Sequence, residues 1–225
     1  MVDESADNNG VDRRMDRSGP PGASAGLPVL RGDRVILRQP VPADVDTRLE
    51  VPADPELHRL YGGSGKPEPV TRASAEAMLA RLNGQDLSQV RQFIIAAMFW
   101  PDGLPIAEPD GRFIGIVRLN ILSREDRRAR LGIGIFDRRF WSRGYGTEAL
   151  RLLLGYGFAE MGLHRIDLRV VEYNRRAIRA YAKCGFVTEG VEREAALVDG
   201  VWYDDVMMSI LESEYRRLHS AEIAR

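Results

Sequence analysis

Apolar and polar positions in the first half of the chain follow two different periods. Short apolar runs at residues 34–38, 92–100, 113–122 and 131–136 have the length and residue types of β-strands. Residues 71–83 instead repeat their apolar side chains at helical spacing. The first half therefore predicts four strands with a helix between the first and the second.

The second half alternates between the two periods. Residues 147–161 have an apolar helical face that ends at Gly162, and Asn174 is placed to cap a second, shorter helix. An Asp-Gly pair separates the last two apolar runs, which is a strong hairpin signal. The elements predicted after the first helix are a strand at 166–171, a helix at 174–184, and strands at 186–198 and 202–211.

The order of these elements predicts an α/β (α+β) architecture. A strand–helix–strand succession requires one parallel pair, and the other neighbours are expected to be antiparallel, which gives a single mixed sheet with helices on both faces. Residues 43–62 are expected to be helical in pieces, broken near Pro52 and Pro55. Gly132 and Gly134 lie inside a strand, where glycine often marks a bulge or the close approach of a ligand.

Composition sets the limits of the folded domain and of its chemistry. Residues 1–28 are rich in Gly, Ser, Asp and Pro and are expected to be a disordered tail, before a domain at 29–218 and a C-terminal tail at 219–225. The single cysteine, Cys184, and three scattered histidines offer neither a disulfide framework nor metal-ligand spacing, so no metal is expected.

Charge and hydropathy give no indication that the protein binds nucleic acid or a membrane. The chain has 32 Lys and Arg against 33 Asp and Glu, a formal net charge of −1. We therefore expect no nucleic acid and no membrane as a partner, and a cytoplasmic location.

The segment that indicates chemistry is Trp141–Ala149, between the glycine-containing strand and the long helix. Gly144 and Gly146 allow the backbone to turn tightly, and the helix that follows adds unpaired N–H groups and the positive end of its dipole. Such a turn is suited to binding a phosphate or pyrophosphate, and Arg143 adds a positive charge. An ordinary strand-to-helix loop is the alternative, because short glycine patterns are common.

Gly144–Ala149 also fits the dinucleotide-binding pattern G-x-G-x-x-G/A, with Asp167 about 20 residues on. The position in the chain disfavours that interpretation. Asp137–Arg143 separate the strand from the first glycine, and only one further strand–helix–strand unit follows the motif. A P-loop is excluded, because no Gly-Lys-Ser/Thr follows.

Five segments in order resemble the GNAT N-acetyltransferases, and in particular the branch of ribosomal-protein alanine acetyltransferases. They read L-G-I-G-I-F, F-W-S-R-G-Y-G-T-E-A-L, L-H-R-I-D-L-R-V, N-R-R-A-I-R-A-Y-A-K-C-G-F and D-G-V-W-Y-D-D-V-M-M-S-I-L. The resemblance covers nearly all of residues 29–218 and implies the GNAT fold, a mostly antiparallel sheet with a bulged, splayed central strand. One departure is Trp141, where many members have Gln or Arg.

The resemblance implies acetyl-CoA as the cosubstrate and assigns its binding residues. The glycine turn would bind the pyrophosphate through backbone N–H groups, and the splayed strand would pair with the pantetheine arm. The residues implied for cofactor binding are Gly134, Ile135, Phe136, Ser142, Arg143, Gly144, Tyr145, Gly146, Thr147, Asn174 and Ala177.

Amine acetylation needs a proton acceptor for the amine and benefits from a proton donor for the leaving thiolate. Tyr181 lies two helical turns after Asn174, and members of the resembling family use a tyrosine there, so we expect it to be the acid. Packing as a core aromatic beside Ile178 is the alternative. The base stays open among Glu192, Glu194, Asp204, Asp205 and a water chain, and Tyr203 and Asp205 are candidate acceptor-binding residues.

The sequence thus supports an N-acetyltransferase that acts on a protein N-terminus or a small amine by direct attack in a ternary complex. A non-catalytic acyl-CoA-binding regulatory module is the alternative. The resemblance implies a monomer or a homodimer. The run of arginines between Arg124 and Arg130 is expected to be a solvated loop, or to attract an anionic substrate or the phosphates of the cofactor.

Overall fold

A computed structural model describes residues 26–223, and the side chains of residues 26–219. The predicted disordered tail at 1–28 falls mainly outside the described residues. Its last part is placed, however, and Leu27 is only 8% exposed and packs in the main core. The folded domain therefore begins before Val29, because an apolar side chain next to the first strand is buried there.

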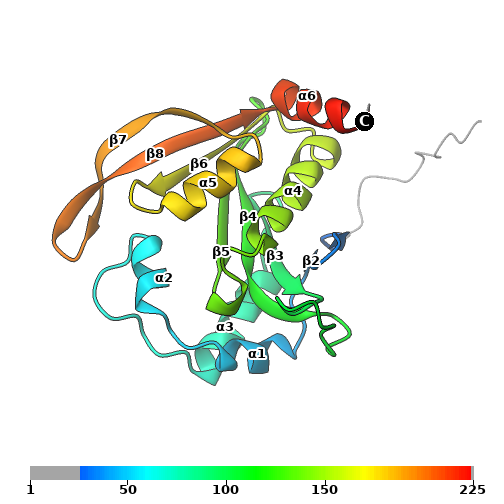
Figure 1. Cartoon of the computed structure of the whole chain (residues 1–225), viewed down its shortest axis with the longest axis vertical. Coiled ribbons are helices and arrows are strands. Elements are labelled where there is room, and N and C mark those ends of the chain that lie inside the picture. The colour runs from blue at the N-terminus through cyan, green and yellow to red at the C-terminus, as the bar shows by residue number, and fades with distance from the viewer. Residues whose placement is uncertain (1–25, 224–225) are drawn as a thin grey trace, which may run out of the picture.

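The described residues form one eight-stranded sheet with the order β1-β2-β3-β4-β5-β6-β8-β7 (Figure 1). Its strands are β1 (Leu30–Arg31), β2 (Val35–Arg38), β3 (Val90–Ala97), β4 (Arg112–Ser123), β5 (Arg128–Ile135), β6 (Arg165–Val171), β7 (Val187–Val198) and β8 (Val201–Leu211). Every neighbouring pair is antiparallel except β5 and β6. The predicted single mixed, mostly antiparallel sheet is confirmed.

The parallel pair separates soon after it forms. β5 and β6 pair only from Arg128–Arg130 with Arg165–Asp167, and the rest of β5 pairs with β4 alone. The central strand is thus splayed as predicted. The pairing of β4 with β5 is regular through Gly132 and Gly134, and its irregularity lies between Ile121 and Ser123, so the expectation of a bulge at these glycines is wrong. Side chains of the protein approach these glycines closely, Tyr61 at Gly134 and Arg118 at Gly132.

Helices cover the two faces of the sheet. They are α1 (Asp44–Glu50), α2 (Pro55–Leu60), α3 (Arg72–Asn83), α4 (Tyr145–Gly155), α5 (Arg175–Lys183) and α6 (Glu212–Ile223), with a 3₁₀ turn η1 (Arg138–Phe140) and a π-helical turn η2 (Tyr156–Glu160). No helix in the described part of the chain combines the length and the apolar character needed to cross a bilayer.

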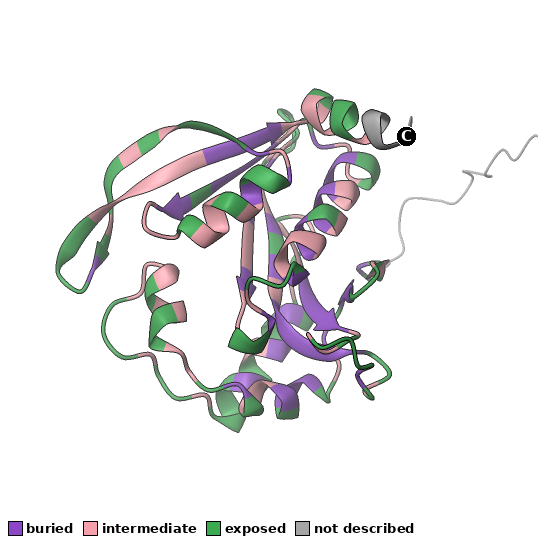
Figure 2. Cartoon of the chain, viewed as in Figure 1, coloured by how far each residue is buried: buried purple, intermediate pink, exposed green. Residues whose placement is uncertain are grey.

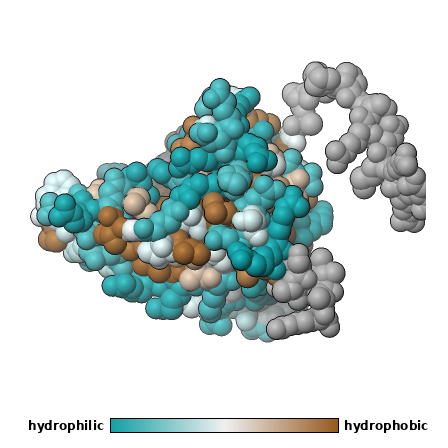
Figure 3. Space-filling view, turned by 90° about the horizontal axis from the view of Figure 1, so that it is seen from above, coloured by the Kyte–Doolittle hydropathy of each residue, from teal (hydrophilic) through white to brown (hydrophobic). Residues whose placement is uncertain are grey.

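Alternation along the strands divides the apolar residues between two cores. On β2, Val35 and Leu37 face the core beneath α4, whereas Ile36 faces the opposite side with Leu82 of α3. The central strands are therefore buried on both sides, and the β7–β8 hairpin that extends beyond them is mainly exposed or half-buried (Figures 1 and 2). Seen from above, the surface is largely hydrophilic with one band of apolar side chains (Figure 3).

Two helix boundaries differ from the sequence predictions. The long helix begins at Tyr145, two residues before the predicted start, because Gly144 takes a left-handed conformation with φ of 89° and serves as its N-cap. The residues after 218 are not all a tail, since α6 continues to Ile223. Its start is fixed by Glu214, which accepts the backbone N–H of Leu211 at 2.9 Å.

A buried ion pair connects β2 to the start of α1. Arg38 and Asp44 are 4% and 2% exposed, and two Nη–Oδ hydrogen bonds of 2.8 and 2.7 Å join them. Arg38 also donates to the carbonyl groups of Asp110 at 2.7 Å and Gly111 at 3.2 Å. The loop before β4, the strand β2 and the helix α1 are therefore held by one guanidinium.

Substitution Asp44→Ala is expected to lower the free energy of unfolding by about 3–5 kcal/mol, because it leaves the Arg38 charge buried without its partner. For a domain of this size the loss corresponds to a fall in Tm of roughly 6–20 °C. Urea unfolding followed by tryptophan fluorescence measures it.

The matched control is Asp46→Ala, which removes the partner of Arg72 on the surface. That pair also has a 2.7 Å contact, but its side chains are 70% and 59% exposed, so water and salt screen it and the expected loss is much smaller than for Asp44→Ala. Equal losses in the two variants would show that burial does not control the strength of the Arg38–Asp44 pair.

Candidate active site

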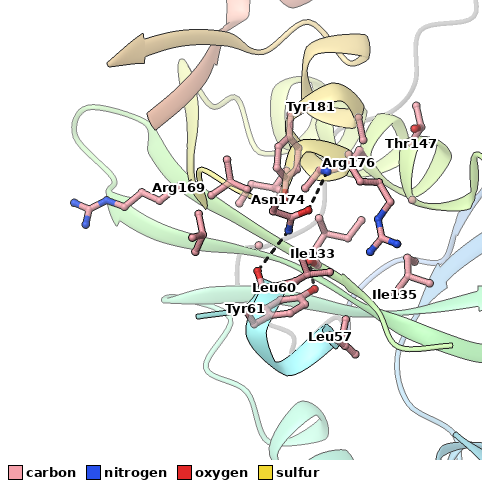
Figure 4. Close-up of a pocket in the computed structure, with 18 of the residues that line it drawn as sticks. Leu57, Leu60, Tyr61, Ile133, Ile135, Thr147, Arg169, Asn174, Arg176 and Tyr181 are labelled. Atoms are coloured by element: carbon pink, nitrogen blue, oxygen red, sulfur yellow. Dashed lines mark hydrogen bonds between the residues drawn. The ribbon is translucent and has the colours of Figure 1, made fainter. Parts of the chain in front are cut away.

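The separation of β5 from β6 opens a cavity of about 380 Å³. It extends from the turn that begins α4, past α5 and α2, to charged residues of β4, β5, β6 and β8. Side chains from these distant segments converge in Figure 4, with Thr147 and Arg176 toward one end and Arg169 toward the other. The volume is in the range of small-molecule sites.

The turn at the start of α4 forms the first end of the cavity. Ser142, Gly144, Gly146 and Thr147 line it, and α4 leaves the N–H groups of its first turn without partners inside the helix. A Cβ on Gly146 would have only Ile135 as a neighbour, at 3.7 Å. Because glycine has no side chain, the space beside its backbone stays open to the cavity. The arrangement suits an anion, because N–H groups and the helix dipole both face it.

Contacts with Arg34 and the first residue of β2 hold this turn in place. Arg34 donates from Nη1 to the carbonyl of Arg143 at 3.0 Å and from Nε to Glu148 at 3.0 Å. Glu148 also accepts the backbone N–H groups of Arg34 at 2.7 Å and Val35 at 3.2 Å. Because Glu148 lies in the first turn of α4, its negative charge also favours the helix dipole.

Trp141 and Arg176 form the wall next to the turn. The indole Nε1 of Trp141 donates to the carbonyl of Ile135 at 2.7 Å, which ties the turn to the open end of β5. The guanidinium carbon of Arg176 lies 3.6 Å from the centroid of the Trp141 ring. Partial burial lowers the pKa of Arg176 from its usual value but leaves it a cation at neutral pH.

α5 contributes the central polar groups. The Asn174 side chain accepts the N–H of Ala177 at 3.2 Å, which begins the helix, and donates to the carbonyl of Leu60 at 3.4 Å (Figure 4). Tyr181 is 7% exposed and lines the cavity. Its hydroxyl has no hydrogen-bond partner among the described residues, and burial raises its pKa, so the phenol stays protonated at neutral pH.

α2 covers the cavity from the side opposite α5. Tyr61, directly after α2, donates its hydroxyl hydrogen bond to the carbonyl of Ile133 (Figure 4). The same hydroxyl lies against Gly134, so that a Cβ at Gly134 would collide with it. Tyr61 therefore occupies the face of β5 where the strand has lost β6 as a partner.

Three attachments keep α2 at this position. Asp54 caps the helix by accepting the N–H of Glu56 at 2.9 Å, and the same carboxylate pairs with Arg138 before the glycine turn. The hydrogen bond to Arg138 is the largest cause that lowers the pKa of Asp54. The Tyr173 hydroxyl donates to the carbonyl of Arg59, at the C-terminal end of the helix.

The third attachment reaches the tip of the β7–β8 hairpin. Asp199 lies 3.3 Å from Nε of Arg59 and accepts the N–H of Gly65 at 2.7 Å. Ser64 donates its hydroxyl to the carbonyl of Leu197 at 3.2 Å. The hairpin and the α2 segment thus enclose one side of the cavity together.

The second end of the cavity is charged. Arg118 of β4, Arg130 of β5, Arg169 of β6 and Asp205 of β8 line it. Arg169 forms a 2.6 Å ion pair with Glu192. Oδ1 of Asp205 is shielded from solvent without a hydrogen-bond partner among the described residues, and burial, followed by the nearby Glu192, raises its pKa.

Asp167 has a structural position instead of the ribose-binding position that the dinucleotide pattern would give it. It is 6% exposed and accepts hydrogen bonds from Arg130 at 2.6 Å and Arg128 at 3.1 Å. The expectation of a solvated loop at 124–130 is therefore wrong for its last residues. Arg128 and Arg130 belong to β5, because the buried carboxylate on the paired strand binds both.

The structure brings most of the predicted site residues to the cavity. Those that line it are Ile135, Ser142, Gly144, Gly146, Thr147, Asn174, Ala177, Tyr181 and Asp205. Gly134 lies directly behind the Tyr61 hydroxyl. Cys184 is buried, with a pKa raised to about 11 by that burial, in agreement with its expected place as a small apolar filler.

Besides Gly134, four predicted residues do not line the cavity. The Tyr145 ring is buried in the core and its hydroxyl donates to the carbonyl of Phe99 at 2.7 Å, and Phe136 packs on Phe113. Arg143 is exposed. Tyr203 packs edge-on against Tyr173, with 4.8 Å between ring centroids. A contact of Arg143 or Tyr145 with a bound anion would come from the backbone N–H.

Sequence reasoning missed several lining residues, including Tyr61, Arg118, Arg169 and Arg176. Arg176 had a detectable signal, since a cation two positions after a cap that faces a phosphate site is a natural ligand. Tyr61 had none, because it lies between a short helix and a glycine-containing loop, far from the motif in the sequence. Within residues 26–223, no group of three or more His, Cys, Asp and Glu side chains could bind a metal ion.

Comparison with known proteins gives the family. The profile of the Acetyltransferase (GNAT) domain matches residues 34–187. An uncharacterized N-acetyltransferase of Bacillus licheniformis is 28% identical over 84% of this chain and 99% of its own. The spermidine N(1)-acetyltransferase of Escherichia coli strain K12 is 31% identical over 51% of this chain and 61% of its own.

The structural comparison agrees with the sequence match. A crystal structure of a putative acetyltransferase superposes with a TM-score of 0.65 at 26% identity, over 88% of this chain and 93% of that one. The family match covers more than half of the chain and includes the splayed strands, the glycine turn and α5. The chain therefore belongs to the GNAT acetyltransferase family and is an acyl-CoA-dependent acetyltransferase.

Proposed function

We propose that this enzyme transfers an acetyl group from acetyl-CoA to a primary amine by direct attack within a ternary complex. The observation that supports this most strongly is the continuity of one cavity, with an anion-binding turn at one end, Tyr181 on its wall and Asp205 at the other end. The non-catalytic alternative is disfavoured, because the relatives are N-acetyltransferases.

The residues present fit a coenzyme A molecule. The open wall at Gly146 and the first turn of α4 suit the pyrophosphate, and Arg176 adds a cation beside it. The separated edge of β5 and the Asn174 side chain suit the amide-containing pantetheine arm. Tyr61, which bonds to Ile133 on that edge, has to move aside to admit the arm.

Acetyl-CoA supplies an acyl carbon activated as a thioester. The carboxylate of Asp205 binds the acceptor ammonium and removes its proton, which frees the nitrogen lone pair. The new bond joins this nitrogen to the acyl carbon while the carbon–sulfur bond breaks. The Tyr181 hydroxyl donates its proton to the departing sulfur, and the nitrogen passes its second proton to the Tyr181 oxygen as the amide forms, so the tyrosine ends as a phenol again.

The specialised branch suggested by the sequence, acetylation of ribosomal-protein N-termini, is one version of this proposal. A peptide acceptor has an α-amine whose pKa near 8 makes proton removal easy. The polyamine substrate named for the Escherichia coli relative is the competing version. A monomer or a homodimer, and a cytoplasmic location, remain part of the proposal.

The first expected result concerns the cofactor. Acetyl-CoA at 100 times its Kd is expected to stabilise the protein by about 2.7 kcal/mol, which raises the Tm by roughly 5–10 °C. Differential scanning fluorimetry measures the shift. NAD is the control ligand, and a shift with NAD but none with acetyl-CoA would support the dinucleotide pattern and contradict the proposal.

The second expected result concerns the acid. Tyr181→Phe is expected to lower kcat about 10²–10⁴-fold, because the phenol proton is lost while the ring is retained. The acetyl-CoA-dependent shift in Tm should persist in the variant. Tyr156→Phe is the matched control, since Tyr156 packs edge-on against Phe93 away from the cavity. An unchanged kcat in Tyr181→Phe would contradict its role as the acid and would show that Tyr181 acts only by packing.

The third expected result concerns Asp205. Its folded pKa is raised, so its burial favours the neutral form: the stability it contributes is present below the unfolded pKa near 3.9 and is lost as pH rises through the folded pKa. Asp205→Asn should therefore raise the Tm at pH 8 more than at pH 4. The same variant should lose at least about tenfold in kcat/KM.

Melting curves at the two pH values and steady-state rates at pH 8 test this pair of effects. Asp204→Asn is the neighbouring control, because Asp204 accepts the N–H of Glu194 at 2.8 Å and does not line the cavity. A Tm gain in Asp205→Asn that is as large at pH 4 as at pH 8 would contradict a raised pKa.

A further inference from the structure

One face of the sheet carries a row of charged side chains at the second end of the cavity. Arg118 lies opposite Gly132, Arg130 opposite Asp167, and Asp205 opposite both Val171 and Glu192. Because side chains alternate between the faces of a sheet, residues at these register positions face the same side. The row therefore runs across β4, β5, β6, β8 and β7.

Most of the row is internally paired. Asp167 binds Arg128 and Arg130, and Glu192 binds Arg169. Two groups are left over, and both line the cavity. The Arg118 side chain forms no hydrogen bond or ion pair with the described residues, and Oδ1 of Asp205 is shielded from solvent without a hydrogen-bond partner among them.

The backbone of β5 holds the Arg118 side chain in position. Its Nε lies 3.1 Å from the place where a Cβ on Gly132 would be, so the side chain rests flat on the backbone of β5. A larger residue at position 132 would lift it from the sheet. The glycine thus lets an exposed arginine hold its guanidinium along the wall of the cavity.

An unpaired cation and an unpaired anion in one cavity complement an acceptor that carries both charges. Three strand spacings separate β4 from β8, roughly 14 Å between backbones. The Arg118 side chain covers part of this distance because it lies across β5, whereas the gap between β5 and β6, which no longer pair at this level, adds to it. An acceptor with its anionic group several bonds from the amine therefore fits the two charges better than one with both groups on the same carbon.

On this basis, which rests on the proposed function, we propose that Arg118 binds a carboxylate of the acceptor while Asp205 binds its amine. The substrate class is a primary amine with a carboxylate several bonds away, as in a dicarboxylic amino acid or a peptide N-terminus followed by an acidic residue. Arg118 supplies two parallel N–H donors that match the carboxylate.

The charge of the cavity disfavours a polyamine. The row places Arg118, Arg128, Arg130 and Arg169 against three carboxylates, Asp167, Glu192 and Asp205. A cation with several positive charges would meet Arg118 without a compensating acid. The acceptor therefore differs from the spermidine named for the Escherichia coli relative.

The experiment compares acceptors that differ only by one carboxylate. Release of free CoA is measured with glutamate against glutamine, and with alanyl-glutamate amide against alanyl-glutamine amide, with spermidine alongside. In at least one pair we expect the acidic member to have a kcat/KM at least tenfold higher. The pair that shows the preference identifies the source, a free amino acid or a peptide N-terminus.

Variants assign the preference to Arg118. Arg118→Gln should bring the acid-to-amide ratio of kcat/KM to about one, and Arg118→Lys should keep part of it, because the charge remains but the bidentate geometry is lost. Arg179→Gln is the matched control, an exposed α5 arginine outside the cavity that removes the same charge. It should keep the full ratio.

Three results would overturn the inference: equal rates within both pairs, a preference that survives Arg118→Gln, or spermidine as the best acceptor. Absence of CoA release with every amine, in protein that acetyl-CoA stabilises, would instead overturn the proposed function. In that event the pairs are compared by calorimetry in the presence of CoA. Equal affinities, or an acidic preference retained by Arg118→Gln, would then overturn the inference as well.

Discussion

The separation of β5 from β6 is the constraint on which the rest of the site depends. Two parallel strands that stay paired bury their edges, whereas these pair over only three residues each and then diverge. Backbone groups freed in this way need other partners. Trp141 and Tyr61 provide them at the carbonyl groups of Ile135 and Ile133, so the start of the glycine turn and the end of α2 are arranged around the gap.

The gap also explains why charge gathers at one place in a nearly neutral chain. Where the strands still pair, Asp167 is buried between Arg128 and Arg130 and fixes the register. Beyond that point the sheet face is open to the cavity, and Arg118 and Asp205 have no partners on neighbouring strands. In the proposed function, the same divergence that would make room for a pantetheine arm leaves charges available for an acceptor.

Much of the end of the cavity at the glycine turn could be predicted, because the residues that form it lie close together in the sequence. Gly144 and Gly146 adjoin the helix they begin, and Asn174 caps α5 three residues before the N–H it binds. The side-chain directions were not predictable from the motif. Tyr145 and Phe136 belong to the same segments but face the core, because the first turn of a helix and a strand end each present one side to neighbours packed far away in sequence.

The sequence by itself determined the strands, the main helices, the mixed sheet and the glycine turn before α4, since periodicity, caps and glycines act over a few residues. The tertiary structure alone decided that Tyr61 closes the edge of β5 and that Asp54 and Asp199 hold its helix in place. It alone left Arg118 and Asp205 unpaired in one cavity. These contacts join residues tens of positions apart, and no local pattern specifies which charges a folded sheet will pair.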